Sequence, residues 1–241
     1  GVPYRKLTRP WAARKADAIV TLTTADKNLY EQHLKPRCLV IDIPNPMIVP
    51  DPAPVYASTS KTILSSGRLT YQKGFDMLVD VAAQVLPQHP GWQWLILGEG
   101  EDRSTLEDKI AHAGIGNQLI LKGRVPDTDS YYRKSAFFVL TSRFEGLPMV
   151  LLEAKAYGLP IVSFDCPTGP SEIIEDAVNG NLVHPDDITA MAKNVDCLIE
   201  DRATRERYAL HAGDGNGRFA KETIIDQWKT LLNTVLRTIA R

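Results

Sequence analysis

Six short apolar runs between residues 61 and 185 constrain the fold of this chain more than any other feature of its sequence. Each run has the length of a β-strand and few polar residues, which is typical of a strand buried on both faces of a parallel sheet. Amphipathic segments lie between the runs, as the crossovers of a parallel sheet require. We predict strands at 61–67, 92–98, 118–123, 136–142, 160–165 and 180–185, and helices at 74–86, 102–113, 128–135, 148–157 and 170–176. This pattern predicts an α/β fold with a doubly wound, Rossmann-like parallel sheet.

The segments that flank this region follow a different pattern. A strand at 17–23, a helix at 25–34 and a strand at 38–43 form a βαβ piece without a sheet of its own, and a lone strand pair is marginal in water. This piece is therefore expected to belong to a preceding domain that is missing or comes from another chain. A stretch with five prolines follows and predicts an interdomain linker. The predicted parts are the domain remnant at 1–43, the linker at 44–60, the sheet domain at 61–218 and a long amphipathic C-terminal helix at 219–241.

Composition excludes several classes of function. The net charge is −1, so no global field favours nucleic acid, and no nucleic-acid partner is expected. The three cysteines, Cys38, Cys166 and Cys197, lack metal-ligand spacing, and such a sparse set is typical of a reducing compartment, which predicts a cytoplasmic protein. The histidines show no paired spacing, so no metal site is expected. No apolar run approaches the roughly 20 residues of a membrane span.

The N-terminal segment is basic and lacks the apolar core of a signal peptide. Two interpretations stay open for it: peripheral contact with the cytoplasmic face of the inner membrane, or a solvated helix face. Its basic side chains are Arg5, Lys6, Arg9, Arg14 and Lys15.

The end of the first strand of the sheet domain carries two cations. Ligands of open parallel sheets bind beyond the carboxyl ends of the strands. Gly67 permits a sharp turn there, and Arg68 and Lys73 follow near the start of the next helix. Cations at a helix N-terminus cost about 0.3–1 kcal/mol each without an anion. A bound phosphate makes the same geometry favourable, so this turn predicts a phosphate site, with two ordinary surface cations as the alternative.

The next two strand ends offer further places for a ligand. Gly98 lies in a Gly-acid-Gly turn that permits close backbone approach. Arg124 and Val125 precede Pro126, and a flat base could hydrogen-bond to the backbone there. For both, a plain strand–helix turn is the alternative. The segment at 165–183 could border the base or the sugar of a ligand, but its main role is interpreted as structural.

The fourth strand leads into "RFEGLPMVLLEAKAYG" at 143–158, which places Glu145 and Glu153 eight positions apart. Pro148 suits the first helical turn, and the N–H groups of Met149 and Val150 are then free to face an anion. Eight residues at helical rise span at most about 12 Å, whereas a glycosidase pair lies about 5–9.5 Å apart. The spacing therefore favours one acid at each end of an elongated ligand with a diphosphate between them. Solvated glutamates are the alternative, which the apolar surroundings of Glu153 make less favourable.

The ordered motifs "GRLTYQKGFDMLV", "LILGEGEDRSTLE", "LKGRV", "SRFEGLPMVLLEAKAYGLPIV" and "NGNLV" resemble the C-terminal half of the GT-B glycosyltransferases of family 4. These are retaining enzymes of glycan assembly, and Glu145 and Glu153 match their E-x7-E pair. The resemblance covers about residues 16–241 and is strongest at 61–183. The phrase "CPTGPSEII" is similar to galactosyl- and N-acetylhexosaminyl-transferases of lipopolysaccharide and related surface glycans, which use UDP-sugars.

The resemblance implies a role for each matching position. Arg68 and Lys73 would bind the donor diphosphate and stabilise the leaving group, and Glu145 would lie at the donor sugar. Glu153 would hold the ribose hydroxyls. The remaining positions implied at the donor are Gly67, Gly98, Arg124, Val125, Gly146, Leu147, Met149 and Val150.

The same resemblance implies partners and leaves alternatives open. The expected partners are a UDP-sugar donor, a glycan or lipid-linked acceptor, and an N-terminal acceptor domain to which the last helix crosses back. No cofactor and no divalent metal are expected, because cations neutralise the diphosphate. A non-catalytic nucleotide-sugar-binding domain is the main alternative. A GT-B phosphorylase would need a pyridoxal-phosphate lysine, and no lysine here has that sequence context.

Overall fold

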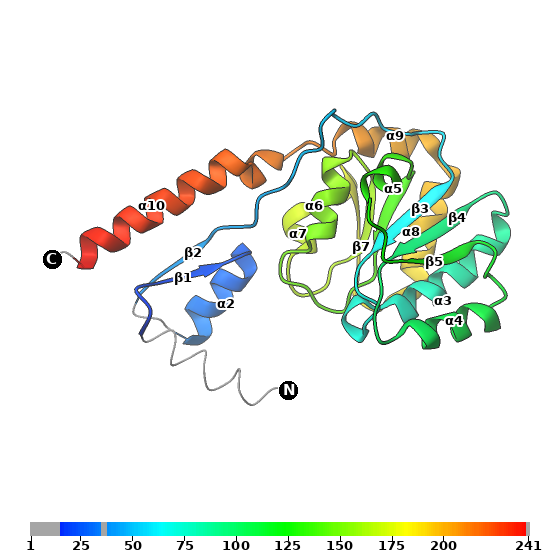
Figure 1. Cartoon of the computed structure of the whole chain (residues 1–241), viewed down its shortest axis with the longest axis horizontal. Coiled ribbons are helices and arrows are strands. Elements are labelled where there is room, and N and C mark those ends of the chain that lie inside the picture. Colours follow the sequence, from blue (N-terminus) through cyan, green and yellow to red (C-terminus); the bar gives the residue numbers. More distant parts are fainter. Residues whose placement is uncertain (1–14, 35–37, 240–241) are drawn as a thin grey trace. The chain divides into compact units, whose positions relative to one another are not determined.

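The computed structural model describes residues 15–34 and 38–239, and the chain divides into two compact units (Figure 1). One unit consists of Gly1–Met47 and Asn216–Arg241, and the other of Ile48–Gly215. The boundary at Met47 falls within the proline-rich segment predicted as a linker. Residues 1–14 of the basic N-terminal segment lie outside the described residues, so both interpretations of that segment stay predictions.

The larger unit is built on one parallel sheet. Its strands are β3 (Thr62–Ser66), β4 (Gln93–Leu97), β5 (Leu119–Gly123), β6 (Phe137–Leu140), β7 (Ile161–Phe164) and β8 (Gly180–Val183). Their order is β5-β4-β3-β6-β7-β8, and every neighbouring pair is parallel. This is the doubly wound order. The strands β3 to β5 are added toward one edge of the sheet and β6 to β8 toward the other, so the order of strands reverses between β3 and β6. The predicted fold class is therefore confirmed.

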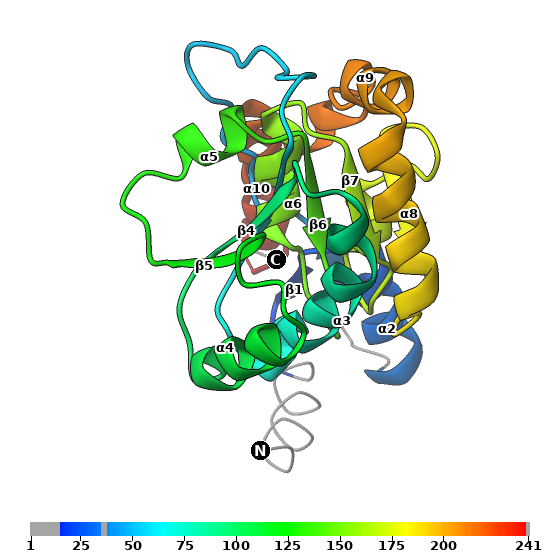
Figure 2. The same ribbon diagram turned by 90° about the vertical axis from the view of Figure 1, so that its right-hand side faces the viewer.

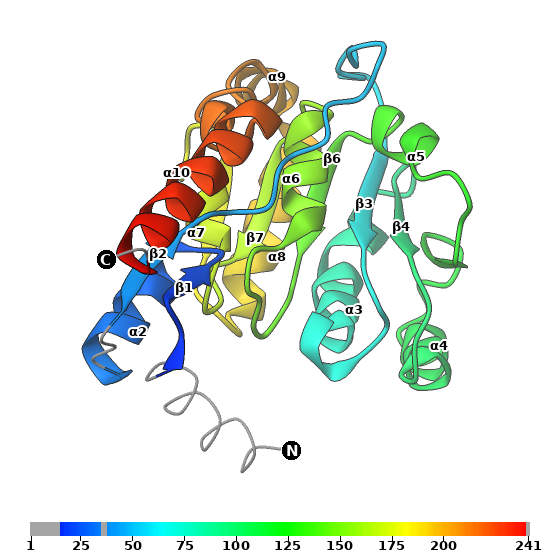
Figure 3. The same cartoon turned by 60° about the vertical axis from the view of Figure 1, so that its left-hand side comes forward.

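Helices cover both faces of this sheet, as the buried apolar strands require. Figure 2 shows α3 and α8 side by side on one face, and Figure 3 shows α6 on the opposite face. Strands β6 and β7 are buried at every position because both of their faces are covered. The helical elements of this unit are η1 (Tyr71–Lys73), α3 (Phe75–Val85), η2 (Leu86–Gln88), α4 (Arg103–His112), α5 (Asp129–Arg133), α6 (Met149–Ala156), α7 (Pro170–Ile173), α8 (Ile188–Glu200) and α9 (Arg202–Leu210).

The smaller unit joins the two ends of the described chain. Its elements are β1 (Ala18–Thr21), α2 (Thr24–Leu34), β2 (Leu39–Asp42), η3 (Asn216–Phe219) and α10 (Lys221–Ile239). Strands β1 and β2 pair in parallel, and Ile224 and Leu231 of α10 are buried with Ile43 beside them. The long helix thus supplies the apolar cover that a lone strand pair lacks. Its assignment to an acceptor-binding domain stays a prediction.

Candidate functional site

Two loops from distant parts of the sequence meet between β3 and β6, where the order of strands in the sheet reverses. β3 and β6 are neighbours, and the loops that follow them carry Lys73 and Glu145. Lys73 Nζ lies 2.6 Å from Glu145 Oε1, and the two side chains are only 16% and 8% exposed. The Ser142 hydroxyl donates a hydrogen bond of 2.7 Å to the same carboxylate oxygen. The structure therefore joins two sequence-predicted residues in one shielded ion pair, with Ser142 as a partner that the sequence did not indicate.

A pocket of about 290 Å³ opens beyond the ends of β3, β4 and β5. Pockets for small molecules start at about 300 Å³, so this one suits a group of nucleoside size. Five of its lining residues were predicted from the sequence. The full lining is Ser66, Gly67, Arg68, Leu97, Gly98, Glu99, Arg124, Val125 and Thr128.

Gly67 connects this pocket to the ion pair. A Cβ atom at Gly67 would lie 3.1–3.3 Å from three side-chain carbons of Lys73, so the lysine chain packs directly over this glycine. Gly98 has φ +138°, and a Cβ there would lie 1.9 Å from the Gly67 carbonyl oxygen. Only glycine at position 98 permits this approach between the ends of β3 and β4.

The two arginines at the pocket carry uncompensated charge. Arg68 and Arg124 are both exposed. Within the described residues, neither guanidinium takes part in a hydrogen bond or an ion pair. Free guanidinium groups beside a pocket favour an anionic ligand, because Arg can donate two parallel hydrogen bonds to a phosphate or carboxylate.

The loop after β7, for which the sequence indicated a mainly structural role, packs against the Glu145 loop. The Glu145 amide donates to the Pro167 carbonyl at 2.9 Å, and the Thr168 amide donates to the Glu145 carbonyl at 3.0 Å. The Thr168 hydroxyl also donates to the Gly146 carbonyl. Burial and the charge of Glu145 raise the pKa of the neighbouring Cys166 to about 12, so its thiol is neutral near pH 7 and unsuited to act as a nucleophile.

The start of α6 differs slightly from the prediction. Pro148 is the N-cap residue, with an extended backbone, and Met149 is the first helical residue. The described chain provides no hydrogen-bond acceptor for the backbone N–H groups of Met149 and Val150. The Leu147 side chain is buried, so at this position the backbone alone can reach a ligand.

Glu153 lies on α6 and is exposed, contrary to the sheltered position that its apolar neighbours predicted. It points away from the core because its neighbours Leu152 and Ala154 fill the buried side of the helix. A buried residue nevertheless orients it: the Tyr132 hydroxyl donates to Glu153 Oε2 at 2.8 Å. Tyr132 is 1% exposed, and burial together with the Glu153 charge raises the pKa of its hydroxyl well above the usual value. Tyr132 was missed because a tyrosine in a short helix gives no distinctive pattern.

A possible metal-binding group lies at the opposite end of β4 from the pocket. The sequence predicted no metal site, but the fold brings His89 close to Asp196 and Glu200, with ligand atoms within 4.8 Å of one another. His89 Nε2 already pairs with Asp196 Oδ1 at 2.7 Å. This arrangement is adequately explained as a hydrogen-bonded His–Asp pair just before β4 and is separate from the pocket.

The fold and the site together define a class of protein. A doubly wound sheet with a nucleoside-sized pocket and cations at its reversal point is the arrangement of nucleotide-binding α/β proteins. Residues 52–212, about two thirds of the chain, match the family described as Glycosyl transferases group 1, and the chain belongs to this family.

Curated relatives agree with this assignment. An uncharacterized glycosyltransferase of Haemophilus influenzae is 34% identical over 228 residues, which are 95% of this chain and 64% of that protein. The amylovoran biosynthesis glycosyltransferase AmsD of Erwinia amylovora is 34% identical over 230 residues, which are 90% of this chain and 62% of that protein. The chain thus spans less than two thirds of the length of either relative.

A solved structure shares the fold. The crystal structure of a mutant of S. aureus TarM in complex with fondaparinux, alpha-GlcNAc-glycerol and UDP has a TM-score of 0.86. It is 24% identical, and the match covers 93% of this chain and 45% of that chain. Within the described residues, no helix has the length and apolarity that a membrane crossing needs.

Proposed function

We propose that this chain carries the donor site of a retaining glycosyltransferase of family 4. The reaction is transfer of a hexosyl or N-acetylhexosaminyl group from a UDP-sugar to a hydroxyl of a glycan or lipid-linked acceptor. The shielded Lys73–Glu145 ion pair beside a nucleoside-sized pocket is the observation that carries this proposal. Further support comes from the UDP in the TarM complex and from the role of AmsD in amylovoran biosynthesis.

The donor is proposed to lie across the end of the sheet. Its base would occupy the pocket near Arg124 and Val125, and its ribose hydroxyls would bond to Glu153. The sugar would lie at Glu145 and the Gly146–Leu147 backbone. Carboxylates suit such hydroxyls because charge-assisted hydrogen bonds are about twice as strong as neutral ones.

The diphosphate would lie between these ends, at Lys73, Arg68 and the first amides of α6. An ammonium group has three donors, so Lys73 can keep Glu145 as a partner while it bonds to phosphate. The acceptor hydroxyl oxygen would form the new bond to the sugar carbon as the bond between the sugar and the phosphate breaks. The electron pair of the broken bond stays on the nucleoside diphosphate, whose oxygen can accept the hydroxyl proton. Lys73 and Arg68 then stabilise that charge, so catalysis comes mainly from positioning and electrostatics. No cofactor and no divalent metal are needed in this scheme.

The donor specificity can be tested with a thermal-shift panel of UDP-, GDP- and ADP-sugars on this chain. A ligand at about 100 times its dissociation constant stabilises by about 2.7 kcal/mol, so UDP-sugars should give the largest shift, unchanged by EDTA. A preference for GDP or ADP would contradict the proposed base, and the absence of any shift would contradict the donor site.

Transfer itself needs a separate experiment, because the chain spans only part of its relatives. Product formation from UDP-sugar and a glycan acceptor, with the anomer determined by NMR, distinguishes the two functions. Tight UDP binding without transfer would favour the alternative of a nucleotide-sugar-binding domain. The proposal includes a cytoplasmic location, for which the sparse and dispersed cysteines are the support.

A further inference from the structure

The ion pair at the donor site is carried by loops rather than by regular elements. Lys73 ends the short turn η1, and Glu145 lies in the loop between β6 and α6. The two residues are 72 positions apart in the sequence. A functional group on a loop keeps its geometry only if other contacts hold that loop, so some contact must join these two segments.

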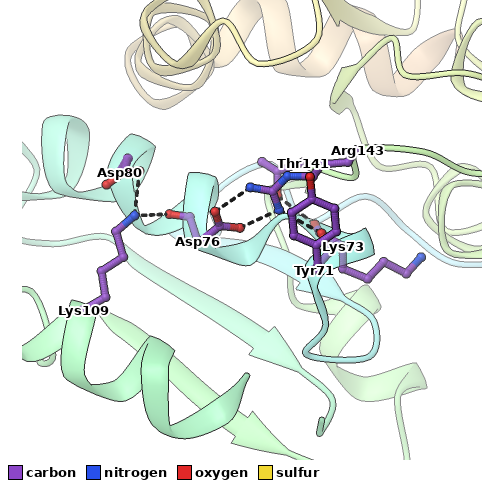
Figure 4. A network of polar contacts seen from close by, with 7 residues as sticks. All are labelled: Tyr71, Lys73, Asp76, Asp80, Lys109, Thr141 and Arg143. Atoms are coloured by element: carbon purple, nitrogen blue, oxygen red, sulfur yellow. Dashed lines mark hydrogen bonds and ion pairs between the residues drawn. The ribbon is translucent and has the colours of Figure 1, made fainter. Parts of the chain in front are cut away.

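Arg143 provides several of the contacts between them (Figure 4). Its guanidinium donates to both carboxylate oxygens of Asp76, at 2.8 and 2.6 Å, and also to the Tyr71 carbonyl at 2.8 Å. The same group lies 4.2 Å from the centre of the Tyr71 ring. The Arg143 amide donates to the Gln72 carbonyl at 2.9 Å, and the Gln72 side chain donates to the Phe144 carbonyl at 3.0 Å. We call this set of five residues the Arg143 clasp.

Lys73 lies between two residues of the clasp in the sequence, Gln72 and Asp76, just before the N-cap of α3. Lys73 directly follows Tyr71 and Gln72 in η1, and its carbonyl accepts a hydrogen bond from the Thr141 hydroxyl at 3.3 Å. The backbone of η1 is thereby hydrogen-bonded to Thr141, which lies in the segment that leads to Glu145. In Figure 4 the Lys73 side chain extends away from the Arg143–Asp76 pair, so the pair holds the turn and leaves the amine available.

Arg143 is poorly suited to bind an anionic ligand itself. Its side chain is 19% exposed, and its charge is already balanced by Asp76. Asp76 lies in the first turn of α3, where an acid is also favoured by the helix dipole. These contacts contrast with Arg68 and Arg124, whose guanidinium groups have no partner among the described residues. Bidentate Arg–carboxylate pairs fix the relative orientation of the two side chains as well as balancing their charges, which suits a positioning role.

We propose that Arg143 is a positioning residue of the donor site, which holds the Lys73 turn so that the Lys73 amine stays beside Glu145. The link to donor binding rests on the function proposed above, but the effect on the position of Lys73 does not. The two parts are therefore tested by separate measurements.

The first measurement reads the position of Lys73 without any nucleotide. Lysines of the full chain are acetylated with a limiting reagent, and peptide mass spectrometry gives the rate at Lys73 relative to Lys193. Arg143→Gln should raise this ratio about tenfold, because loss of the clasp frees an amine now held in a charge-assisted hydrogen bond. Arg143→Lys keeps the positive charge but lacks the planar guanidinium that bonds to both oxygens of Asp76, so it should give an intermediate ratio. It also serves as the second variant if the glutamine variant does not fold.

Asp80→Asn is the matched control for this measurement. Lys109 bonds to Asp80 and to the Asp76 carbonyl, so this change breaks the outer end of the same network without touching Arg143. The Lys73 ratio should stay at its wild-type value in this variant. An unchanged Lys73 ratio in folded Arg143→Gln, or an equal rise in Asp80→Asn, would overturn the positioning role.

The second measurement compares the affinities for UDP and for uridine by calorimetry. Arg143→Gln should weaken UDP binding about tenfold and leave uridine binding nearly unchanged, because the loss concerns the phosphate contacts of Lys73. In a Lys73→Ala background the same substitution should have almost no further effect on UDP. Equal losses for both ligands, or additive losses in the double variant, would contradict the link to the donor. If the wild-type chain binds no UDP, the proposed function fails, while the acetylation ratio still decides the positioning role.

Discussion

The two glutamates of the E-x7-E pair are held in different ways. Glu145 is 8% exposed and has partners from three loops: Lys73 after β3, Ser142 after β6 and Pro167 after β7. Glu153 is exposed on a regular helix and is oriented by one buried hydroxyl, that of Tyr132. We call these surroundings the Glu145 side and the Glu153 side of the site.

The two glutamates differ because one lies in a loop and the other in a regular helix. On the Glu145 side, charges in loops need the Arg143 clasp and tightly packed glycines to stay in place. On the Glu153 side, the helix already determines the backbone, so a single hydrogen bond suffices. Changes on the Glu145 side should therefore cost more than comparable changes on the Glu153 side.

The largest expected difference concerns one glycine on each side. Gly74 ends the lysine turn at φ +62°, and a Cβ there would lie 2.2 Å from the Thr141 carbonyl oxygen. Gly158 follows α6 at φ +71° with open space around it. Gly74→Ala should lower the free energy of unfolding by about 3 kcal/mol or more, through backbone strain and overpacking. Gly158→Ala should cost about 1 kcal/mol from backbone strain alone. Urea denaturation measures both, and equal losses would contradict the comparison.

The second prediction separates the phosphate end of the donor from its ribose end. Lys73→Ala should weaken UDP binding about 100-fold and leave uridine binding nearly unchanged, since a hydrogen bond to a charged group contributes about 1.5–3 kcal/mol. Glu153→Gln should weaken UDP and uridine alike by about tenfold, because the ribose belongs to both ligands. Calorimetry provides the affinities, and Lys193→Ala, at an exposed position of α8, is the control for loss of a lysine outside the site. A loss of uridine binding in Lys73→Ala would show that this lysine does not act on phosphate.

The third prediction tests the single hydrogen bond of the Glu153 side. Tyr132→Phe should weaken both UDP and uridine binding by about fivefold, because a typical hydrogen bond contributes about 1 kcal/mol. Tyr157→Phe is the matched control: the Tyr157 ring stacks on Tyr132 at 5.0 Å, but its hydroxyl donates to Asp129 rather than to Glu153. Affinity should be nearly unchanged in that variant. Similar losses in both variants would mean that ring packing, not the hydroxyl, orients Glu153.

The smallest expected difference is in acid stability. The Arg143 hydrogen bonds lower the pKa of Asp76 below 3.8, and a hydrogen bond from Arg133 lowers the pKa of Asp129 in the same direction. A carboxyl group with a depressed folded pKa contributes stability above its unfolded pKa, and this contribution is lost as pH falls through the folded value. The free energy of unfolding of the wild type should therefore decrease as the pH drops below about 3.8. Asp76→Asn should reduce this fall more than Asp129→Asn does, because a guanidinium bonds to both oxygens of Asp76. Asp129 has a guanidinium on one oxygen and only the neutral Tyr157 hydroxyl on the other. Urea midpoints at about pH 6 and about pH 3 measure the effect, and a larger change in Asp129→Asn would contradict it.

The order of elements in the larger unit was predictable because its strands are buried on both faces. The apolar runs at 136–142 and 160–165 correspond to β6 and β7, which are buried at every position. Glycines after strands were equally informative. Gly67 and Gly98 mark the turns where β3 and β4 approach each other, and both line the pocket. Periodicity and turn chemistry are local properties, so the sequence displays them directly.

The partners of the site residues were not predictable in the same way. The sequence indicated Lys73 and Glu145 separately, but their contact spans 72 positions. Arg143 and Asp76 are 67 positions apart, and Tyr132 and Glu153 are 21 apart. The exposure of Glu153 was also misjudged, because its apolar neighbours face the core while it faces outward.

The sequence by itself thus determined the class of fold, the order of the elements and the strand ends that carry charge. The tertiary structure alone decided which charges meet, through the reversal between β3 and β6 that brings two loops together. It also decided that α10 covers β1 and β2, at the other end of the sequence. The physical reason is that strand order and helix packing depend on contacts between segments far apart in the chain, and no local pattern encodes those contacts.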